Sequence, residues 1–67
     1  EQKMIVNNAM KALKKEYAQV LYLKYFEDLR SEDIAQIMDK SKRQISDLLY
    51  RAKQALKAEL ETRDNNG

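Results

Sequence analysis

Apolar residues recur every three or four positions along four stretches of the chain, and this spacing predicts four amphipathic helices. The first stretch covers about residues 2–13 and ends near Lys14. Its apolar positions are Met4, Ile5, Ala9, Ala12 and Leu13. The second covers about residues 16–27 and is so densely apolar that we expect it to be nearly surrounded by the other helices. Its apolar positions are Tyr17, Val20, Leu21, Leu23, Tyr25 and Phe26.

Local chemistry marks the starts of the third and fourth helices. Ser31 is expected to cap the third helix with its hydroxyl, and acidic residues follow in the first turn. This helix carries Ile34, Ala35, Ile37 and Met38 and stops near Asp39. Ser41 and Gln44 form the capping-box pattern at the start of the fourth helix, which nothing interrupts before about Arg63. Its apolar positions are Ile45, Leu48, Leu49, Ala52, Leu56 and Leu60.

Only Asp39 and Lys40 separate the last two helices, a turn short enough to predict the steep crossing of a helix-turn-helix. Asp39 tolerates the left-handed backbone that such a turn needs. Ala35 is small enough for the two helices to approach closely. We therefore predict an all-α, four-helix helix-turn-helix domain over residues 1–63, a DNA-binding bundle of the homeodomain-like or winged-helix-like kind without a wing. Residues 64–67 have no apolar anchor, and we expect a disordered tail there.

Composition excludes several classes of function. The chain of 67 residues has no cysteine and no histidine, which argues against a disulfide, a thiolate or imidazole metal site and the usual nucleophile and base pairs. So short a chain has no room for an ordinary catalytic pocket, so we expect neither an enzyme nor a cofactor. No apolar run is long enough to cross a bilayer, and we expect a cytoplasmic protein that does not bind membranes.

Positive charge is concentrated on the fourth helix. The segment 40–57 holds six basic residues and only one acid, Asp47, whereas the rest of the chain is slightly acidic. A polyanion is the natural partner of such an element.

The outward side of the fourth helix is rich in groups that bind DNA. Arg43 can fork onto a guanine edge, Gln44 onto an adenine edge, and Lys42 onto guanine or phosphate. The candidate DNA-binding residues are Ser41, Lys42, Arg43, Gln44, Ser46, Asp47, Tyr50, Arg51 and Lys53. Among them Lys42, Arg43, Gln44 and Ser46 are expected in the major groove, and Tyr50, Arg51 and Lys53 on the backbone. The alternative interpretation is that these side chains only face solvent, although Lys and Arg at a helix start oppose the helix dipole.

The aromatic residues of the second helix are interpreted as core residues rather than as a platform for base stacking. They are Tyr17, Tyr22, Tyr25 and Phe26. Met4, Met10 and Met38 are likewise interpreted as residues that fill gaps in the core.

From about Leu13 to Leu60 the sequence resembles region four of bacterial sigma factors, especially those of the extracytoplasmic-function type. The residues that carry the resemblance are the run from Val20 to Leu29, the run from Glu32 to Met38, and Ser41, Ile45, Leu49, Arg51, Ala52, Lys53 and Leu56. The resemblance implies a fragment of a longer sigma factor that binds the minus-thirty-five promoter element through its last helix. It also implies docking on the beta-subunit flap of RNA polymerase, and an anti-sigma factor is a further candidate partner.

Several positions depart from the family's pattern. Asp39 stands where the turn usually has glycine, and Lys40 where an apolar residue is usual. Common basic positions of the recognition helix are Ser46 and Leu48 here, with the acidic Asp47 between them.

Two alternative functions stay open. A DNA-binding domain of a LuxR-type regulator would act as a dimer, whereas we expect a monomer. A protein-interaction module would bind polymerase or an anti-sigma factor without reading DNA, and Asp47 favours it because phosphates repel a carboxylate.

Overall fold

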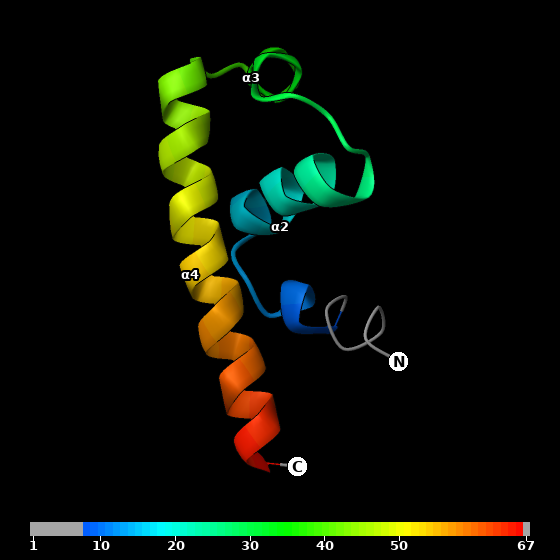
Figure 1. The fold of residues 1–67 in the computed structure, drawn as a ribbon, viewed down its shortest axis with the longest axis vertical. Helices are drawn as coiled ribbons and strands as arrows, with labels where there is room; N and C mark the ends of the chain where they lie inside the picture. Colours follow the sequence, from blue (N-terminus) through cyan, green and yellow to red (C-terminus); the bar gives the residue numbers. More distant parts are fainter. Residues whose placement is uncertain (1–7, 67) are drawn as a thin grey trace.

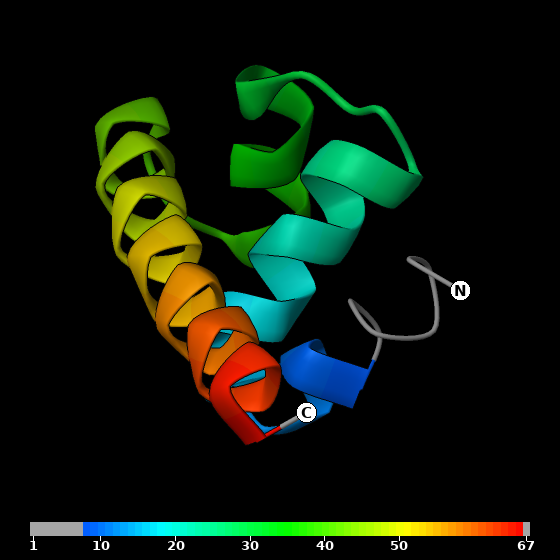
Figure 2. The same ribbon diagram turned by 60° about the horizontal axis from the view of Figure 1, so that its bottom comes forward.

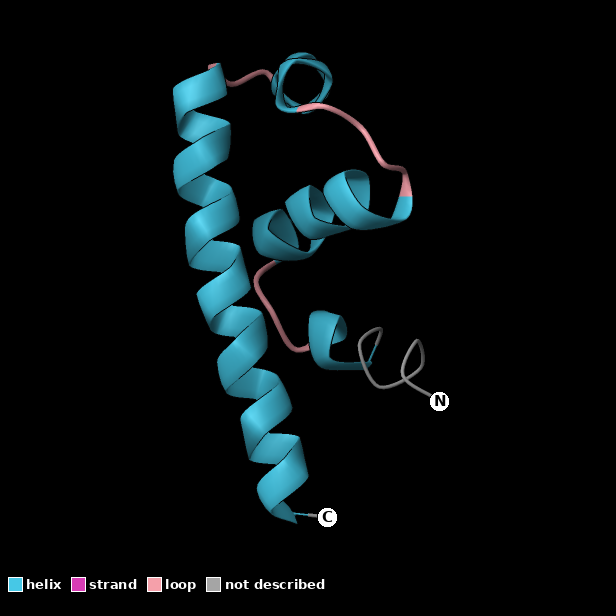
Figure 3. Cartoon of the chain, viewed as in Figure 1, coloured by secondary structure: helices cyan, strands magenta, loops and turns pink. Residues whose placement is uncertain are grey.

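The computed structural model describes residues 8–66, with side chains described as far as residue 62. This part of the chain contains four helical segments and no strand (Figures 1 and 3). A helical turn at residues 8–11 is followed by α2 (Lys15–Leu21), which continues directly into a wider-wound turn, η1 (Tyr22–Phe26). Then come α3 (Ser31–Met38) and α4 (Lys42–Asn66). The predicted all-α, four-helix fold is confirmed.

The long helix α4 runs the length of the molecule, and the other helices pack against it. Its 25 residues span about 37 Å at 1.5 Å per residue, close to the longest extent of the molecule, 38 Å. Both α2 and α3 pack against it. In Figure 1, α3 is seen end-on beside the start of α4, so the two helices cross steeply as the short turn predicts. The tilted view of Figure 2 shows that α2 and α3 lie on the same side of α4.

One apolar core joins the helices. Ile34 on α3 and Ile45 on α4 are fully buried, and Ala35 of α3, which is 7% exposed, belongs to the same core. Val20 and Leu21 of α2 complete the centre, while Leu48, Leu49 and Ala52 extend it along α4. Met10 is buried in the core and Met38 packs against it half-buried, as predicted.

The prediction that the second helix is nearly surrounded is wrong. Tyr22, Tyr25 and Phe26 are 46%, 54% and 39% exposed, and among the aromatic residues of this helix Tyr17 alone packs against the core. An all-round apolar pattern predicts burial only if neighbours exist on every side. In a chain this short the described parts of the other helices cover this helix incompletely, and these three rings remain exposed.

The backbone of the second helix also changes where its exposed aromatic residues begin. The N–H of Glu27 donates to the carbonyl of Tyr22, five residues back, at 3.1 Å. Asp28 then adopts a left-handed backbone with φ 56°, and the N–H of Leu29 donates to the carbonyl of Leu23 at 3.1 Å. This wider turn closes the helix and brings Leu29 against the core. The sequence predicted an ordinary helix to Glu27.

Three helix ends differ from the predictions. Arg30, with an extended backbone, precedes α3, and Ser31 is the first helical residue, so its hydroxyl does not form the predicted cap. In the described part of the first stretch the helix ends at residue 11, and Ala12 is exposed in the turn that follows. Met4 and Ile5 lie outside the described residues. Helix α4 continues to Asn66, beyond the end predicted near Arg63.

Candidate nucleic-acid interface

The turn between α3 and α4 is held by its own backbone. Asp39 has φ 57° and ψ 49°, the left-handed conformation predicted for it. The N–H of Lys40 donates to the carbonyl of Ala35 at 2.8 Å, and that of Asp39 to Gln36 at 3.3 Å. These are the two bonds of a Schellman motif, in which glycine usually takes the left-handed position. The motif fixes the direction in which the chain leaves α3 toward α4.

The start of α4 is fixed by the predicted capping box. The N–H of Gln44 donates to Oγ of Ser41 at 3.0 Å, and the N–H of Ser41 donates to Oε1 of Gln44 at 2.8 Å. Two backbone donors that the helix itself cannot pair are thereby satisfied. The first turn of α4 therefore begins at a defined residue.

The predicted DNA-binding side chains all lie exposed around the first three turns of α4. They are Ser41, Lys42, Arg43, Gln44, Ser46, Asp47, Tyr50, Arg51 and Lys53. At about 100° per residue, Arg43, Asp47 and Tyr50 project from the middle of the side opposite the core. Tyr50 is 67% exposed. The arrangement presents a continuous hydrogen-bonding surface, which we call the outer face.

The positive charges at the start of the outer face destabilise α4. No acidic residue occurs in the first turn of α4, where Lys42 and Arg43 stand at the positive end of the helix dipole. Each such cation costs roughly 0.3–1 kcal/mol at an exposed site. Asp47 lies one turn from both Arg43 and Arg51, yet among the described residues it forms no ion pair. Both signs of charge are thus available to a ligand.

Lys53 lies at the edge of this surface, beside the second helix. Its Nζ lies 5.7 Å from the centre of the Tyr25 ring. Lys53 and Tyr25 line a shallow apolar groove together with Leu21 and Leu56. Lys53 therefore lies at the edge of the outer face, away from its middle, where Arg43, Asp47 and Tyr50 project.

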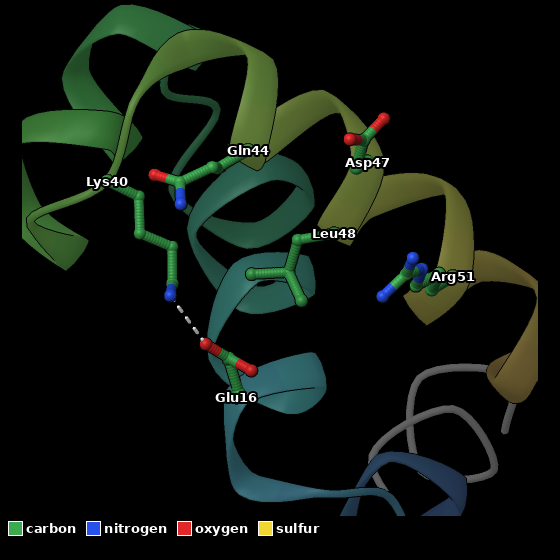
Figure 4. A pocket seen from close by; sticks show the side chains of 6 residues that line it. All are labelled: Glu16, Lys40, Gln44, Asp47, Leu48 and Arg51. Carbon is green, nitrogen blue, oxygen red and sulfur yellow. Dashed lines mark ion pairs between the residues drawn. The ribbon is translucent and has the colours of Figure 1, made fainter.

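The structure adds Lys40, which the list of candidate residues lacks. Its Nζ forms an ion pair of 2.9 Å with Oε2 of Glu16, at the start of α2. Glu16 and Lys40 line a polar pocket together with Gln44, Asp47, Leu48 and Arg51 (Figure 4). Lys40 belongs to the basic segment 40–57, and that surplus of charge was the sequence signal for it.

Other kinds of site are not found in the described part of the chain. No cluster of three or more acidic, cysteine or histidine side chains there is arranged to hold a metal ion. None of its helices combines the length and the apolar character that a membrane span requires.

Comparison with known proteins gives a family for this fold and surface. The family model for region 4 of sigma-70 matches residues 3–56. This family in general binds the −35 promoter element and RNA polymerase, and it is a family of DNA-binding proteins rather than of enzymes. Neither a curated protein nor a solved structure matches the chain.

Proposed function

Because the chain belongs to the sigma-70 region 4 family, we propose that it binds the −35 element of promoters through the outer face of α4. The observation that carries the proposal is the pair of cations, Lys42 and Arg43, exposed at the dipole-positive start of α4. Since this placement disfavours the helix, stability does not explain it, whereas a polyanionic ligand does. The family match favours this reading over that of a LuxR-type regulator.

In this proposal the residues at the start of α4 have different tasks. Lys42, Arg43 and Ser46 are directed to base edges in the major groove, and Arg51 with Tyr50 to the phosphate backbone. Gln44 already uses Oε1 to cap the helix. Its amide N–H groups remain for a base or phosphate oxygen, and the two-bond readout of adenine would require Oε1 as well. Lys53 supports the backbone contacts from the edge of the surface.

Asp47 on the outer face is compatible with DNA binding, because it would contribute to the choice of base sequence. A carboxylate is repelled by phosphates, but in the major groove it accepts a hydrogen bond from the amino group of cytosine. Because Asp47 is exposed and unpaired in the described structure, this acceptor is available. Its presence therefore does not argue for a protein-interaction module alone.

Selection from a randomised duplex pool tests the proposal. The wild-type domain is expected to enrich one sequence, and Arg43→Ala to lose about 1–3 kcal/mol of binding free energy and to relax selection at one base pair. Lys11→Ala is the matched control, because it removes one positive charge from the helical turn at residues 8–11, far from the start of α4 (Figure 1). Enrichment of no sequence by the wild type, or equal relaxation by both variants, would overturn the proposal.

We also propose that the second helix provides the surface for RNA polymerase. The rings of Tyr22 and Phe26 lie 5.3 Å apart and are exposed. Tyr22 further lines a groove with Met10 and Ala18, whose rim carries Lys11 and Lys15. Exposed aromatic side chains of this kind are enriched where proteins meet. The flap of the beta subunit is the proposed occupant, and an anti-sigma factor would compete for the same surface.

Binding of an isolated flap fragment tests this second contact. Tyr22→Ala is expected to weaken flap binding while leaving DNA binding unchanged, and Arg43→Ala to do the reverse. Unchanged flap binding by Tyr22→Ala would show that the flap contacts a different surface of the domain. The proposal includes a monomeric, cytoplasmic DNA-binding domain without catalytic activity.

A further inference from the structure

The ion pair between Glu16 and Lys40 joins two parts of the fold that are far apart in the chain. Lys40 belongs to the turn that precedes α4, and Glu16 to the first turn of α2. Figure 4 shows that the side chains of Lys40 and Arg51 both extend toward the space above Glu16, whereas Asp47 points away from it. Lys40 therefore lies beside a candidate phosphate-binding residue, with its charge neutralised by a neighbour.

This pair is open to exchange. The side chains of Lys40 and Glu16 are 30% and 47% exposed, so water and salt screen their attraction. No buried group holds either partner, because among the described residues no polar side chain is buried in the core. A DNA phosphate offers the same ammonium a stronger field, reinforced by the neighbouring phosphates of the strand. Glu16 is therefore expected to hold Lys40 more weakly than a DNA phosphate does.

We propose that Lys40 is a further DNA-contacting residue that Glu16 keeps paired in the free protein, and that a backbone phosphate replaces Glu16 when DNA binds. The inference rests on the proposed function, since it needs the start of α4 to approach DNA. Glu16 thereby lowers the affinity for all DNA alike, because a phosphate must displace it from Lys40. The contact carries no base information and sets the strength of binding rather than its sequence.

A double-mutant cycle measured by fluorescence anisotropy tests this exchange. The variants are Glu16→Gln, Lys40→Gln and the double substitution, each with a promoter-like and a scrambled duplex over a range of salt concentrations. Glu32→Gln is the matched control, because Glu32 is the second residue of α3 as Glu16 is of α2, is exposed, and is not held in an ion pair in the described structure. Circular dichroism confirms that each variant is folded.

The exchange predicts a specific pattern. Lys40→Gln weakens binding to both duplexes and lowers the slope of log affinity against log salt by about 0.9. Glu16→Gln strengthens binding by up to about fivefold, the equivalent of an exposed ion pair, and this gain disappears when Lys40 is already replaced.

Three results would overturn the inference. An equal gain from Glu16→Gln with and without Lys40, matched by Glu32→Gln, would show a general charge effect only. Weaker binding by Glu16→Gln would show that the pair positions α4 rather than restraining Lys40. Absence of DNA binding by the wild-type domain at every salt concentration would remove the proposed function itself, and this inference with it.

Discussion

Replacing Ser41 by alanine removes the oxygen that accepts the N–H of Gln44 at 3.0 Å. An N-cap hydroxyl contributes about 0.5–2 kcal/mol to stability. Since Ser41 is exposed, water can reach the freed N–H, and we expect a loss at the lower end, about 0.5–1 kcal/mol. Gln44→Ala removes the reciprocal bond of 2.8 Å to the N–H of Ser41 and is expected to cost about 0.5 kcal/mol.

Urea unfolding followed by circular dichroism measures these losses. Ser46→Ala is the matched control, because it makes the same change inside α4, five residues after Ser41, where alanine favours the helix. We expect it to leave the free energy of unfolding unchanged or to raise it slightly. Gln44→Glu keeps a carboxyl oxygen for the N–H of Ser41 and is expected to restore what Gln44→Ala loses.

Two outcomes would show that the capping box does not stabilise the start of α4. The first is Ser41→Ala with the unfolding free energy of the wild type. The second is an equal loss from Ser46→Ala, because the serine hydroxyl would then matter for a reason other than its place at the helix start. Either result would remove the physical basis for the defined beginning of α4.

Three further predictions concern the turn, the crossing and the exposed aromatic surface. Asp39→Gly is expected to stabilise the domain by up to about 1 kcal/mol and Asp39→Val to destabilise it by more than that, because a branched side chain disfavours the left-handed backbone; urea unfolding that ranks them otherwise would contradict this. Ala35→Leu is expected to cost about 1–3 kcal/mol by overfilling the helix crossing, and a variant as stable as wild type would show that the crossing has spare room. The hydrogen bond to Glu27 and the negative charge of that residue raise the pKa of the Tyr22 phenol. The stabilisation by this bond is therefore present at neutral pH and is lost as the pH rises through the raised pKa. An NMR titration of Glu27→Gln should show the pKa of Tyr22 fall toward its ordinary value, and an unchanged pKa would exclude this cause.

The helix-turn-helix could be predicted from sequence because its determinants are local. Ser41 and Gln44 are three residues apart and form their two bonds within one turn. Asp39 is a residue type that accepts the left-handed backbone found there. Ala35, a small residue among apolar neighbours, was predicted to face the core, and it is buried there. The exposure of the predicted outer face followed from the helical period alone.

The features that sequence reasoning missed depend on contacts between segments. Whether Tyr25 and Phe26 are buried depends on how many helices surround them, which their own spacing does not contain. The wider turn that starts at Tyr22 has no local signal in the residues themselves. Lys40 escaped the list of candidate residues because its partner, Glu16, comes from another helix. The failure of Ser31 as a cap is instead local, because α3 begins at Ser31 itself, one residue earlier than the pattern indicates.

Equilibrium binding of the wild-type domain is the decisive test of whether the outer face of α4 reads promoter DNA. Fluorescence anisotropy would compare a promoter-like duplex with a scrambled duplex at two salt concentrations. We predict tighter binding to the promoter-like duplex and a steep fall in affinity as salt rises, because cations at the start of α4 displace counterions from the phosphates. Equal binding to both duplexes, or no binding at the lower salt concentration, would contradict the claim.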